Sequence, residues 1–204
     1  LKFNDAVDPQ QNAVLFDQTA QRVYLAQTGL VTTQPGVSLP NHFTVMRALP
    51  GERTLADGQK ELSISFESPE IGGVQLVKSY TFRRGEYPVA VKHAVKNNAA
   101  APVSPQLYLQ LARDGNPPAG ESSFYFTFTG PAMYTDASKF KKIEFKDIEK
   151  GNADHDKAAD NGWVGMVQHY FASAWLLPDN AQREFRTAKV SNNFYSIAIV
   201  VPAG

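Results

Sequence analysis

The stretch that decides the fold of this chain is Gly162-Trp163-Val164-Gly165-Met166-Val167-Gln168-His169-Tyr170-Phe171-Ala172-Ser173-Ala174-Trp175-Leu176-Leu177-Pro178. It holds both tryptophans of the protein and no aspartate, glutamate, lysine or arginine. Because so apolar a run has to be covered by other parts of the chain, we expect it to cross the middle of the core.

Two secondary structures fit this stretch. With a period of 3.6 residues its apolar side chains gather on one helical face, and with a period of two both faces are mostly apolar, as in a strand buried on both sides. The glycines at its start and its β-branched and aromatic content favour the strand, and Pro178 ends it in either case. We therefore expect one strand with a bend or bulge near Gln168 and His169.

Short alternating runs of apolar and polar residues surround this stretch. The clearest is 61–67, and the runs 74–82 and 87–95 are joined by a short glycine-containing turn, which predicts a β-hairpin. Further strands are expected at 13–16, 22–27, 43–49, 103–111, 124–129, 132–135, 139–148, 183–190 and 194–201. No run predicts an amphipathic helix of three turns, so we expect an all-β, antiparallel sandwich with little helix, in one domain.

Composition excludes several classes of function. Lysine plus arginine and aspartate plus glutamate both number 20, so nothing indicates a nucleic-acid partner. The chain has no cysteine, which excludes disulfides, thiol catalysis and zinc sites with cysteine ligands. It starts at Leu1 with neither an initiator methionine nor a signal peptide, so we expect it to be an excised piece of a longer protein.

The residues that favour chemistry are few. His42, His93, His155 and His169 are scattered, and for the two in apolar runs, His93 and His169, a hydrogen-bonded core histidine is the favoured interpretation. Asp154-His155-Asp156 imitates a metal cluster, but a solvated acidic loop is favoured because hard cations need spaced oxygen ligands on a shaped loop. The sequence contains no HExxH, GxSxG, Walker or GxGxxG motif. We expect no catalytic residue, no metal and no cofactor.

Two segments are candidates for binding, although the ordinary interpretation is favoured for each. The charged, alternating run 139–148 predicts an exposed edge strand, and its partner-contact candidates are Lys139, Phe140, Lys141, Lys142 and Lys146. Lysines on an edge usually serve to prevent unwanted strand pairing, yet this edge is the best place in the sequence for a partner strand. Phe124, Phe126 and Phe128 could line a groove for sugar or peptide, but such a stripe more often packs in a core.

Three blocks, in order along the chain, resemble one family. Val23 to Leu30 is similar to an early "aromatic, x, A-Q-S/T-G-L" block, and Tyr80 to Tyr87 is similar to an "F-x-R-G-D/E-Y" hairpin. Gly162 to Pro178 is similar to the long and specific "G-W-V-x-M-x-Q-x-Y-F-x-x-A-W-x-x-P" block. Together the blocks resemble the first, large periplasmic domain of the bacterial membrane protein insertases of the YidC/Oxa/Alb family.

This resemblance implies a β-supersandwich, similar to the galactose mutarotase-like and carbohydrate-binding folds. It implies a single periplasmic domain over 1–204 that is truncated at both ends and lacks the transmembrane insertase bundle. Trp163, Tyr170, Phe171 and Trp175 are then expected to be core anchors. The edges left open by the truncation would also permit a dimer.

The function implied by the resemblance is that of a non-catalytic scaffold in the periplasm, part of a Gram-negative inner-membrane protein. It would contact SecDF and other Sec translocon components while membrane proteins are inserted and folded. Two alternatives stay open. A carbohydrate-binding or aldose-epimerase-like module follows from the fold alone, which is weak evidence. A chaperone-like binder of unfolded clients requires an exposed apolar patch of several hundred Å².

Overall fold

The computed structural model describes residues 3–5, 7–118 and 127–203. The chain forms two compact units, each considered by itself below. Within the described residues, the sandwich unit comprises the parts of the chain from 3 to 28 and from 107 to 202, and the hairpin unit comprises residues 29–106 and 203. The expectation of one truncated domain over 1–204 is not decided by this division and stays a prediction.

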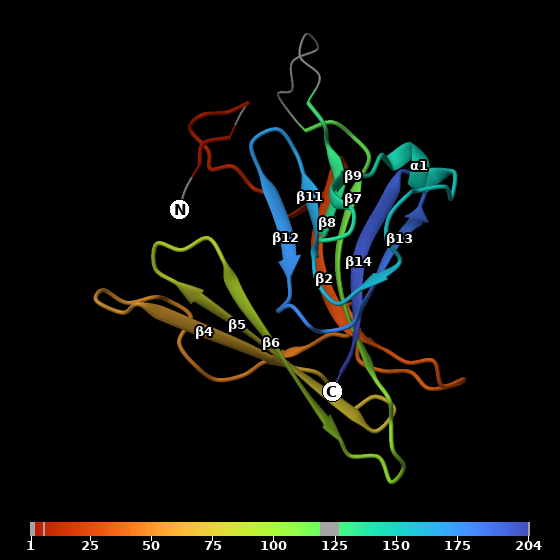
Figure 1. Ribbon diagram of the computed structural model, residues 1–204. Helices are drawn as coiled ribbons and strands as arrows, with labels where there is room; N and C mark the ends of the chain where they lie inside the picture. Colours follow the sequence, from red (N-terminus) through yellow and green to blue (C-terminus); the bar gives the residue numbers. More distant parts are fainter. Residues whose placement is uncertain (1–2, 6, 119–126, 204) are drawn as a thin grey trace. The chain divides into compact units, whose positions relative to one another are not determined.

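Two antiparallel sheets build the sandwich unit (Figure 1). The first has six strands in the order β1 (Asp17–Gln18), β2 (Val23–Val31), β7 (Gln106–Asp114), β14 (Phe194–Pro202), β13 (Arg183–Ser191) and β10 (Ala158–Ala159). The second has four strands in the order β12 (Ala172–Leu176), β11 (Trp163–Val167), β8 (Gly130–Thr135) and β9 (Lys139–Lys142). The short helix α1 (Phe145–Glu149) follows β9.

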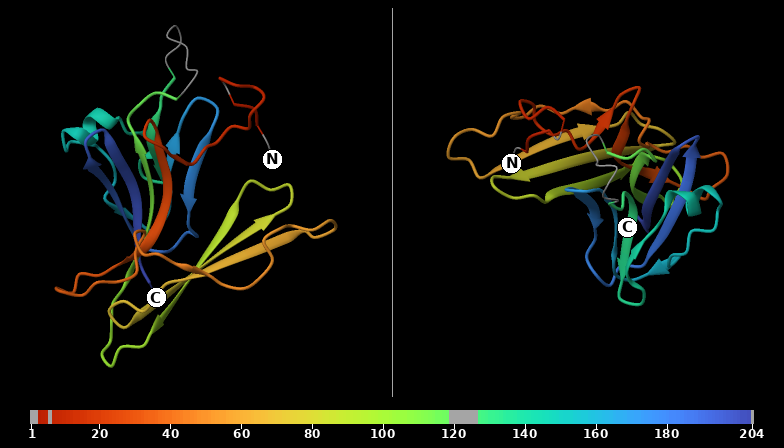
Figure 2. Two further views of the ribbon diagram at one scale, coloured as in Figure 1. Left: turned by 180° about the vertical axis from the view of Figure 1, so that it is seen from behind. Right: turned by 90° about the horizontal axis from the view of Figure 1, so that it is seen from above.

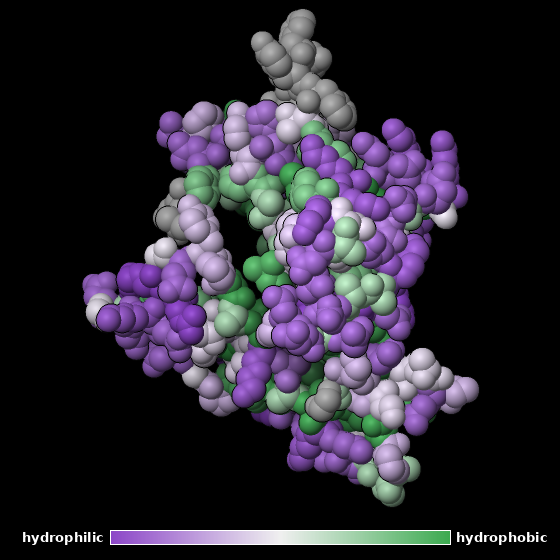
Figure 3. Space-filling model, viewed as in Figure 1, coloured by the Kyte–Doolittle hydropathy of each residue, from purple (hydrophilic) through white to green (hydrophobic). Residues whose placement is uncertain are grey.

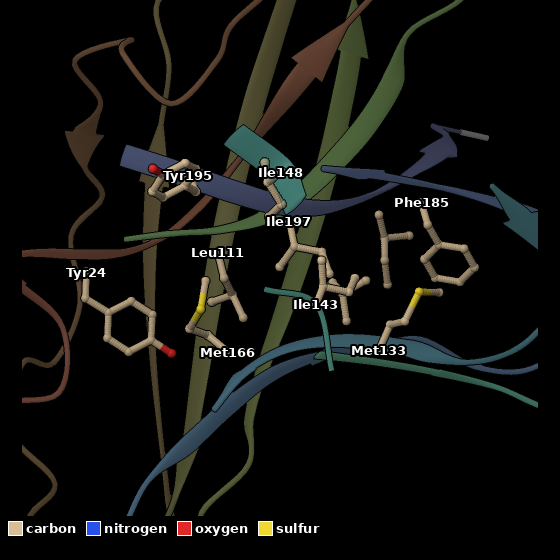
Figure 4. Close-up of a cluster of buried hydrophobic side chains, with 11 residues drawn as sticks. Tyr24, Leu111, Met133, Ile143, Ile148, Met166, Phe185, Tyr195 and Ile197 are labelled. Atoms are coloured by element: carbon tan, nitrogen blue, oxygen red, sulfur yellow. The ribbon is translucent and has the colours of Figure 1, made fainter. Parts of the chain in front are cut away.

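The core of the sandwich unit lies between these sheets. Met133 and Met166 of the four-stranded sheet point toward Phe185 and Ile197 of the six-stranded sheet (Figure 4). The full set of buried side chains in this cluster is Tyr24, Leu111, Met133, Ile143, Ile148, Val164, Met166, Phe185, Tyr195, Ile197 and Ile199. Because successive residues of a strand point to opposite faces, burial of Val164 and Met166 directs Trp163 and Gly165 to the other face of the sheet.

The hairpin unit contains one antiparallel sheet in the order β3 (Arg47–Ala48), β4 (Glu61–Glu67), β5 (Val74–Arg83) and β6 (Val89–Asn97). Its long β5–β6 hairpin can be followed in both views of Figure 2. On one face the hydroxyls of Ser65 and Ser79 are hydrogen-bonded at 2.7 Å. The other face carries mostly apolar side chains, and on it Lys78 pairs directly across β5 and β6 with His93.

The predicted fold class is confirmed: the described residues form three antiparallel sheets with one short helix. The strand expected at 61–67 is β4, and the expected hairpin is β5–β6. Other expectations were too long or misplaced. The run 43–49 contributes only β3, the run 13–16 is not a strand, and the run 124–129 lies outside the described residues up to 126, with 127–129 not in a strand.

The stretch from Gly162 to Pro178 is a hairpin, not a single strand. The chain reverses at 168–171, where the backbones of Gln168 and Phe171 exchange two hydrogen bonds, and Trp163 pairs with Leu176. Seventeen extended residues would span about 55 Å, far more than a usual strand. The expected bend near Gln168 and His169 was therefore in the right place, but it is a complete reversal of the chain.

The charged run 139–148 is divided between two elements. Residues 139–142 form the edge strand β9, as expected, and the chain then turns into α1. Two spacings compete in this run, because Phe140 and Lys142 follow a strand period whereas Phe145 and Ile148 are three apart. Burial of Ile148 in the core decides for the helix, since tertiary packing overrides local pattern in short segments.

Candidate partner-binding surface

β9 is the last strand of the four-stranded sheet and its outward edge is open in the part of the chain that the structure describes. It pairs only with β8, in a register that places Tyr134 opposite Phe140 and Ala132 opposite Lys142. Four of the five predicted partner contacts, Lys139 to Lys142, therefore lie on one exposed edge. The fifth, Lys146, is exposed on α1.

The hydrogen-bond parity of β9 shows which backbone groups face outward. The Ile143 N–H donates to the Pro131 carbonyl at 2.9 Å, so this pair belongs to the hydrogen-bonded set. Hydrogen-bonded and non-hydrogen-bonded pairs alternate along an antiparallel ladder. The N–H and C=O groups of Phe140 and Lys142 therefore point away from β8, toward the open edge.

The lysines of β9 differ in their surroundings. Lys141 forms an ion pair of 3.1 Å with Asp154. The Lys142 ammonium lies 5.1 Å from the centre of the Phe128 ring, and that of Lys139 lies 5.8 Å from the centre of the Tyr134 ring. Among the described residues, neither Lys139 nor Lys142 forms an ion pair with a carboxylate. Hydrophilic side chains also cover most of the surface around α1 (Figure 3).

An apolar row crosses the outer face of the same sheet, one residue from each strand. Its members are Leu176, Trp163, Tyr134 and Phe140, which are successive cross-strand partners. Leu176 and Phe140 at the two ends are 68% and 50% exposed. The Trp163 and Tyr134 rings are stacked at 6.3 Å with 11° between their planes. We call these four residues the outer row.

A shallow hollow of about 180 Å³ adjoins the outer row where the strands end. Its walls include the Trp163 and Tyr134 rings together with the polar side chains of Asp136, Asn161 and Asp179. The Tyr134 hydroxyl donates to an Asp136 carboxylate oxygen at 3.2 Å, and the Asn161 side chain accepts from the Asp136 N–H at 2.8 Å. The hollow thus combines aromatic rings with carboxylates.

Asp156 fixes the turn that carries β9, and sequence reasoning missed this role. Its carboxylate accepts hydrogen bonds from Thr135, at the end of β8, and from Ser138 at 2.6 Å. The Ser138 hydroxyl, followed by that of Thr135, holds the pKa of Asp156 below its ordinary value. The only sequence signal for this role was the pair of hydroxyl residues around the turn, Thr135 and Ser138, together with a distant acidic loop.

The four expected core anchors have different positions. Trp175 packs against the core and its indole N–H donates to the Gln110 carbonyl at 3.0 Å. Phe171 is half-buried, with its ring 5.5 Å from that of Phe3. Two expectations are wrong: Tyr170 is 78% exposed because it lies in the turn of the hairpin, and Trp163 lies in the outer row because strand alternation places Val164 inside.

Three phenylalanines were expected to line a groove. Phe124 and Phe126 lie outside the described residues. Phe128 is 9% exposed, and an edge of its ring would lie 2.9 Å from a side chain added at Gly130. Phe128 is therefore packed against the start of β8.

His155 and His169 have separate hydrogen-bond partners in the part of the chain that the structure describes. Buried His155 contacts the Asp156 carbonyl at 2.7 Å and the Thr187 hydroxyl at 3.1 Å, and desolvation lowers its pKa. Exposed His169 contacts the Thr127 hydroxyl at 2.6 Å. Within the described ranges, no three His, Asp or Glu side chains are grouped so that they could hold a metal ion. No described helix is long and apolar enough to cross a membrane.

Comparison with known proteins agrees with the three sequence blocks. A family model described as the YidC periplasmic domain matches residues 1–204. A membrane protein insertase YidC of Janthinobacterium sp. (strain Marseille) is 46% identical over the whole chain, which covers 35% of that protein. The corresponding protein of Herminiimonas arsenicoxydans is 45% identical over the whole chain and 35% of its own length. That of Cupriavidus necator is 50% identical over 94% of the chain and 33% of its own length.

The chain thus spans 33% to 35% of the length of these three relatives. The family model covers every residue, and these three relatives are 45% to 50% identical to the chain. The chain therefore belongs to the YidC periplasmic domain family, a non-catalytic family of periplasmic domains present in proteins named membrane protein insertase YidC.

Proposed function

We propose that this chain is the periplasmic scaffold and docking domain of an inner-membrane insertase, and that it receives SecDF and other Sec translocon components. In that setting it aids the insertion and folding of membrane proteins. The observation that carries the proposal is the open edge of β9, whose outward backbone groups belong to Phe140 and Lys142. Family membership supports the insertase setting.

An open edge of this kind suits a partner that adds a strand. Backbone hydrogen bonds then supply affinity, and alternate side chains supply specificity. The edge has four residues and three lysines, which keeps it from pairing indiscriminately. A selective partner can still use it, because the free N–H and C=O groups are already aligned.

The scaffold behind this edge is firmly held. Asp156 ties the β8–β9 turn to the loop before β10. At the other end of β9, α1 is fastened to the six-stranded sheet, where Glu149 accepts from the Tyr195 hydroxyl at 2.8 Å and pairs with Lys189 at 2.5 Å. A strand held at both ends loses little conformational entropy when a partner binds, which favours docking.

A proline scan of edge residues in the full-length insertase tests this role. Lys142→Pro removes an outward N–H from β9, and proline is tolerated there because the β8 ladder does not use that N–H. Ala174→Pro is the matched control: counted from the hydrogen-bonded pair Gln168–Phe171, its N–H points away from β11, toward the edge at the other end of the same sheet in the described part of the chain. We expect SecDF recovery in a pull-down to fall strongly with Lys142→Pro and to stay near the wild-type level with Ala174→Pro. Equal recovery by wild type and both variants would reject docking at β9.

One observation favours a second candidate, a carbohydrate-binding module. The hollow beside the outer row joins the rings of Trp163 and Tyr134 with Asp136 and Asn161, a combination that suits the apolar face and hydroxyls of a sugar. The aldose-epimerase variant of this idea is set aside because the family is non-catalytic. A glycan array probed with the full-length protein tests the module, and an array without signal would dismiss it.

A further inference from the structure

Resting on the proposed docking role of β9, we infer that the segment received there is an extended strand with an apolar and an acidic residue two positions apart. The two residues face Phe140 and Lys142. Both side chains project from the outer face of the sheet, since residues i and i+2 of a strand share a face. The inference names the chemistry of the partner and leaves its identity to experiment.

The apolar requirement follows from the outer row. Leu176, Trp163, Tyr134 and Phe140 run across all four strands and end at the open edge. Phe140 is half exposed, and among the described residues its cross-strand neighbour is Tyr134. A strand added to β9 would place one side chain directly beside Phe140 and continue the row. Burial of an apolar side chain there is favourable, and an aromatic or β-branched one suits a cross-strand pair.

The acidic requirement follows from charge. Three of the four β9 residues are lysines, and Asp154 is already paired with one of them, Lys141. Lys142 is exposed, and the Phe128 ring beneath it holds its ammonium close to the edge. An added strand would bring one side chain opposite Lys142 on the same face as Phe140. Opposite charges across a ladder stabilise the pair, and like charges destabilise it.

The same charge pattern argues against a second copy of this chain as the occupant. If two β9 edges paired with one another, the three lysines of one strand would lie next to the same three lysines of the other. Their repulsion disfavours an edge-to-edge dimer through β9. A partner with an acidic residue near an apolar one avoids this cost and gains both contacts.

Labelled peptides test the inference on the full-length insertase in detergent. The probe is Thr-Glu-Thr-Phe-Thr-Glu-Thr, which presents its acidic and apolar residues in either strand direction, and its counterpart has lysine in place of each glutamate. By fluorescence anisotropy we expect the glutamate peptide to bind about tenfold more tightly, and the difference to shrink at high salt. Lys142→Glu should reverse this preference, and Lys142→Pro should abolish binding of both peptides.

Each other outcome has a defined meaning. The acidic requirement is overturned if the two peptides bind equally, or if Lys142→Glu does not change the preference. Even then, loss of SecDF from Lys142→Pro in the pull-down would uphold docking at β9. A serine in place of the phenylalanine that binds equally well overturns the apolar requirement. A dimeric mass that disappears with Lys142→Pro would identify a second copy as the occupant. Circular dichroism and Ala174→Pro serve as controls for folding.

Discussion

The Phe140 ring lies 6.0 Å from the Trp163 ring, although their strands, β9 and β11, are separated by β8. Tyr134 of β8 lies between them in the register and is stacked on Trp163. An aromatic cluster therefore links the open edge to the centre of the sheet, on the face turned away from the core. The two tryptophans of the protein consequently have different environments.

The different environments of the two tryptophans predict unequal effects on stability. Trp175→Ala removes a ring that packs on the core and an indole N–H bonded to Gln110, so we expect it to lower the free energy of unfolding by about 3 kcal/mol. Trp163→Ala removes an outer-row ring and should cost about 1 kcal/mol. Urea denaturation provides the measurement. Equal losses from the two variants would contradict the assignment of Trp163 to the outer face.

Gly162 predicts a steric effect with a matched control. It has φ +95°, and a Cβ there would lie 2.0 Å from the Tyr134 carbonyl oxygen. Gly151 has φ +70° with open space around it. We expect Gly151→Ala to cost about 1 kcal/mol, from backbone strain alone, and Gly162→Ala to cost more than about 2 kcal/mol, because the β8–β11 pairing must shift. Thermal unfolding measures the stability of both variants. Equal losses of stability would show that the close approach to the Tyr134 carbonyl is not the cause.

Asp156→Asn tests the turn that supports β9. The change replaces a carboxylate that accepts two hydroxyl hydrogen bonds, so we expect a loss of about 2 kcal/mol. Asp154→Asn is the control: its side chain is 91% exposed, and its ion pair with Lys141 should contribute less than about 1 kcal/mol. Urea denaturation near neutral pH compares the two. A greater loss from Asp154→Asn would show that the turn does not depend on Asp156.

The lowered pKa of Asp156 also sets a pH dependence. Its folded-state pKa lies below the ordinary 3.8, so the unfolded state binds the proton more readily. The stabilisation is therefore present above about pH 4 and is lost as the pH falls through the folded value. The difference between wild type and Asp156→Asn should narrow in that acidic range. A difference that widens there would contradict the direction of the shift.

His93 predicts a second, less acidic window. Desolvation, together with the nearby Lys78 charge, lowers the pKa of His93 from 6.5 to about 4. Desolvation, followed by the Lys78 charge, also lowers the pKa of His42. Between pH 6.5 and about 4, His93 binds more protons in the unfolded state than in the folded state. Stability therefore falls as the pH drops through this range. His93→Gln should flatten the pH dependence in this window. Denaturation midpoints that fall equally in wild type and variant would assign the effect to other groups.

The sequence by itself determined the fold class and the family. Alternation in runs such as 61–67 and 74–82 is a local property, since period-two burial requires only that one face of a strand meets a core. The long block from Gly162 to Pro178 was specific enough to indicate the family without any structure. Lysine-rich alternation also located the open edge at β9, because edge strands carry charge for a local reason.

Only the tertiary structure decided where the chain reverses and which side chains face inward. The Gly162–Pro178 stretch is apolar on both faces, so its pattern could not show that it folds back at 168–171, or that Tyr170 is exposed there. The outer row and the hydrogen bonds to Asp156 join residues from separate parts of the chain. Such contacts depend on strand order and register, which distant packing determines and no local spacing records.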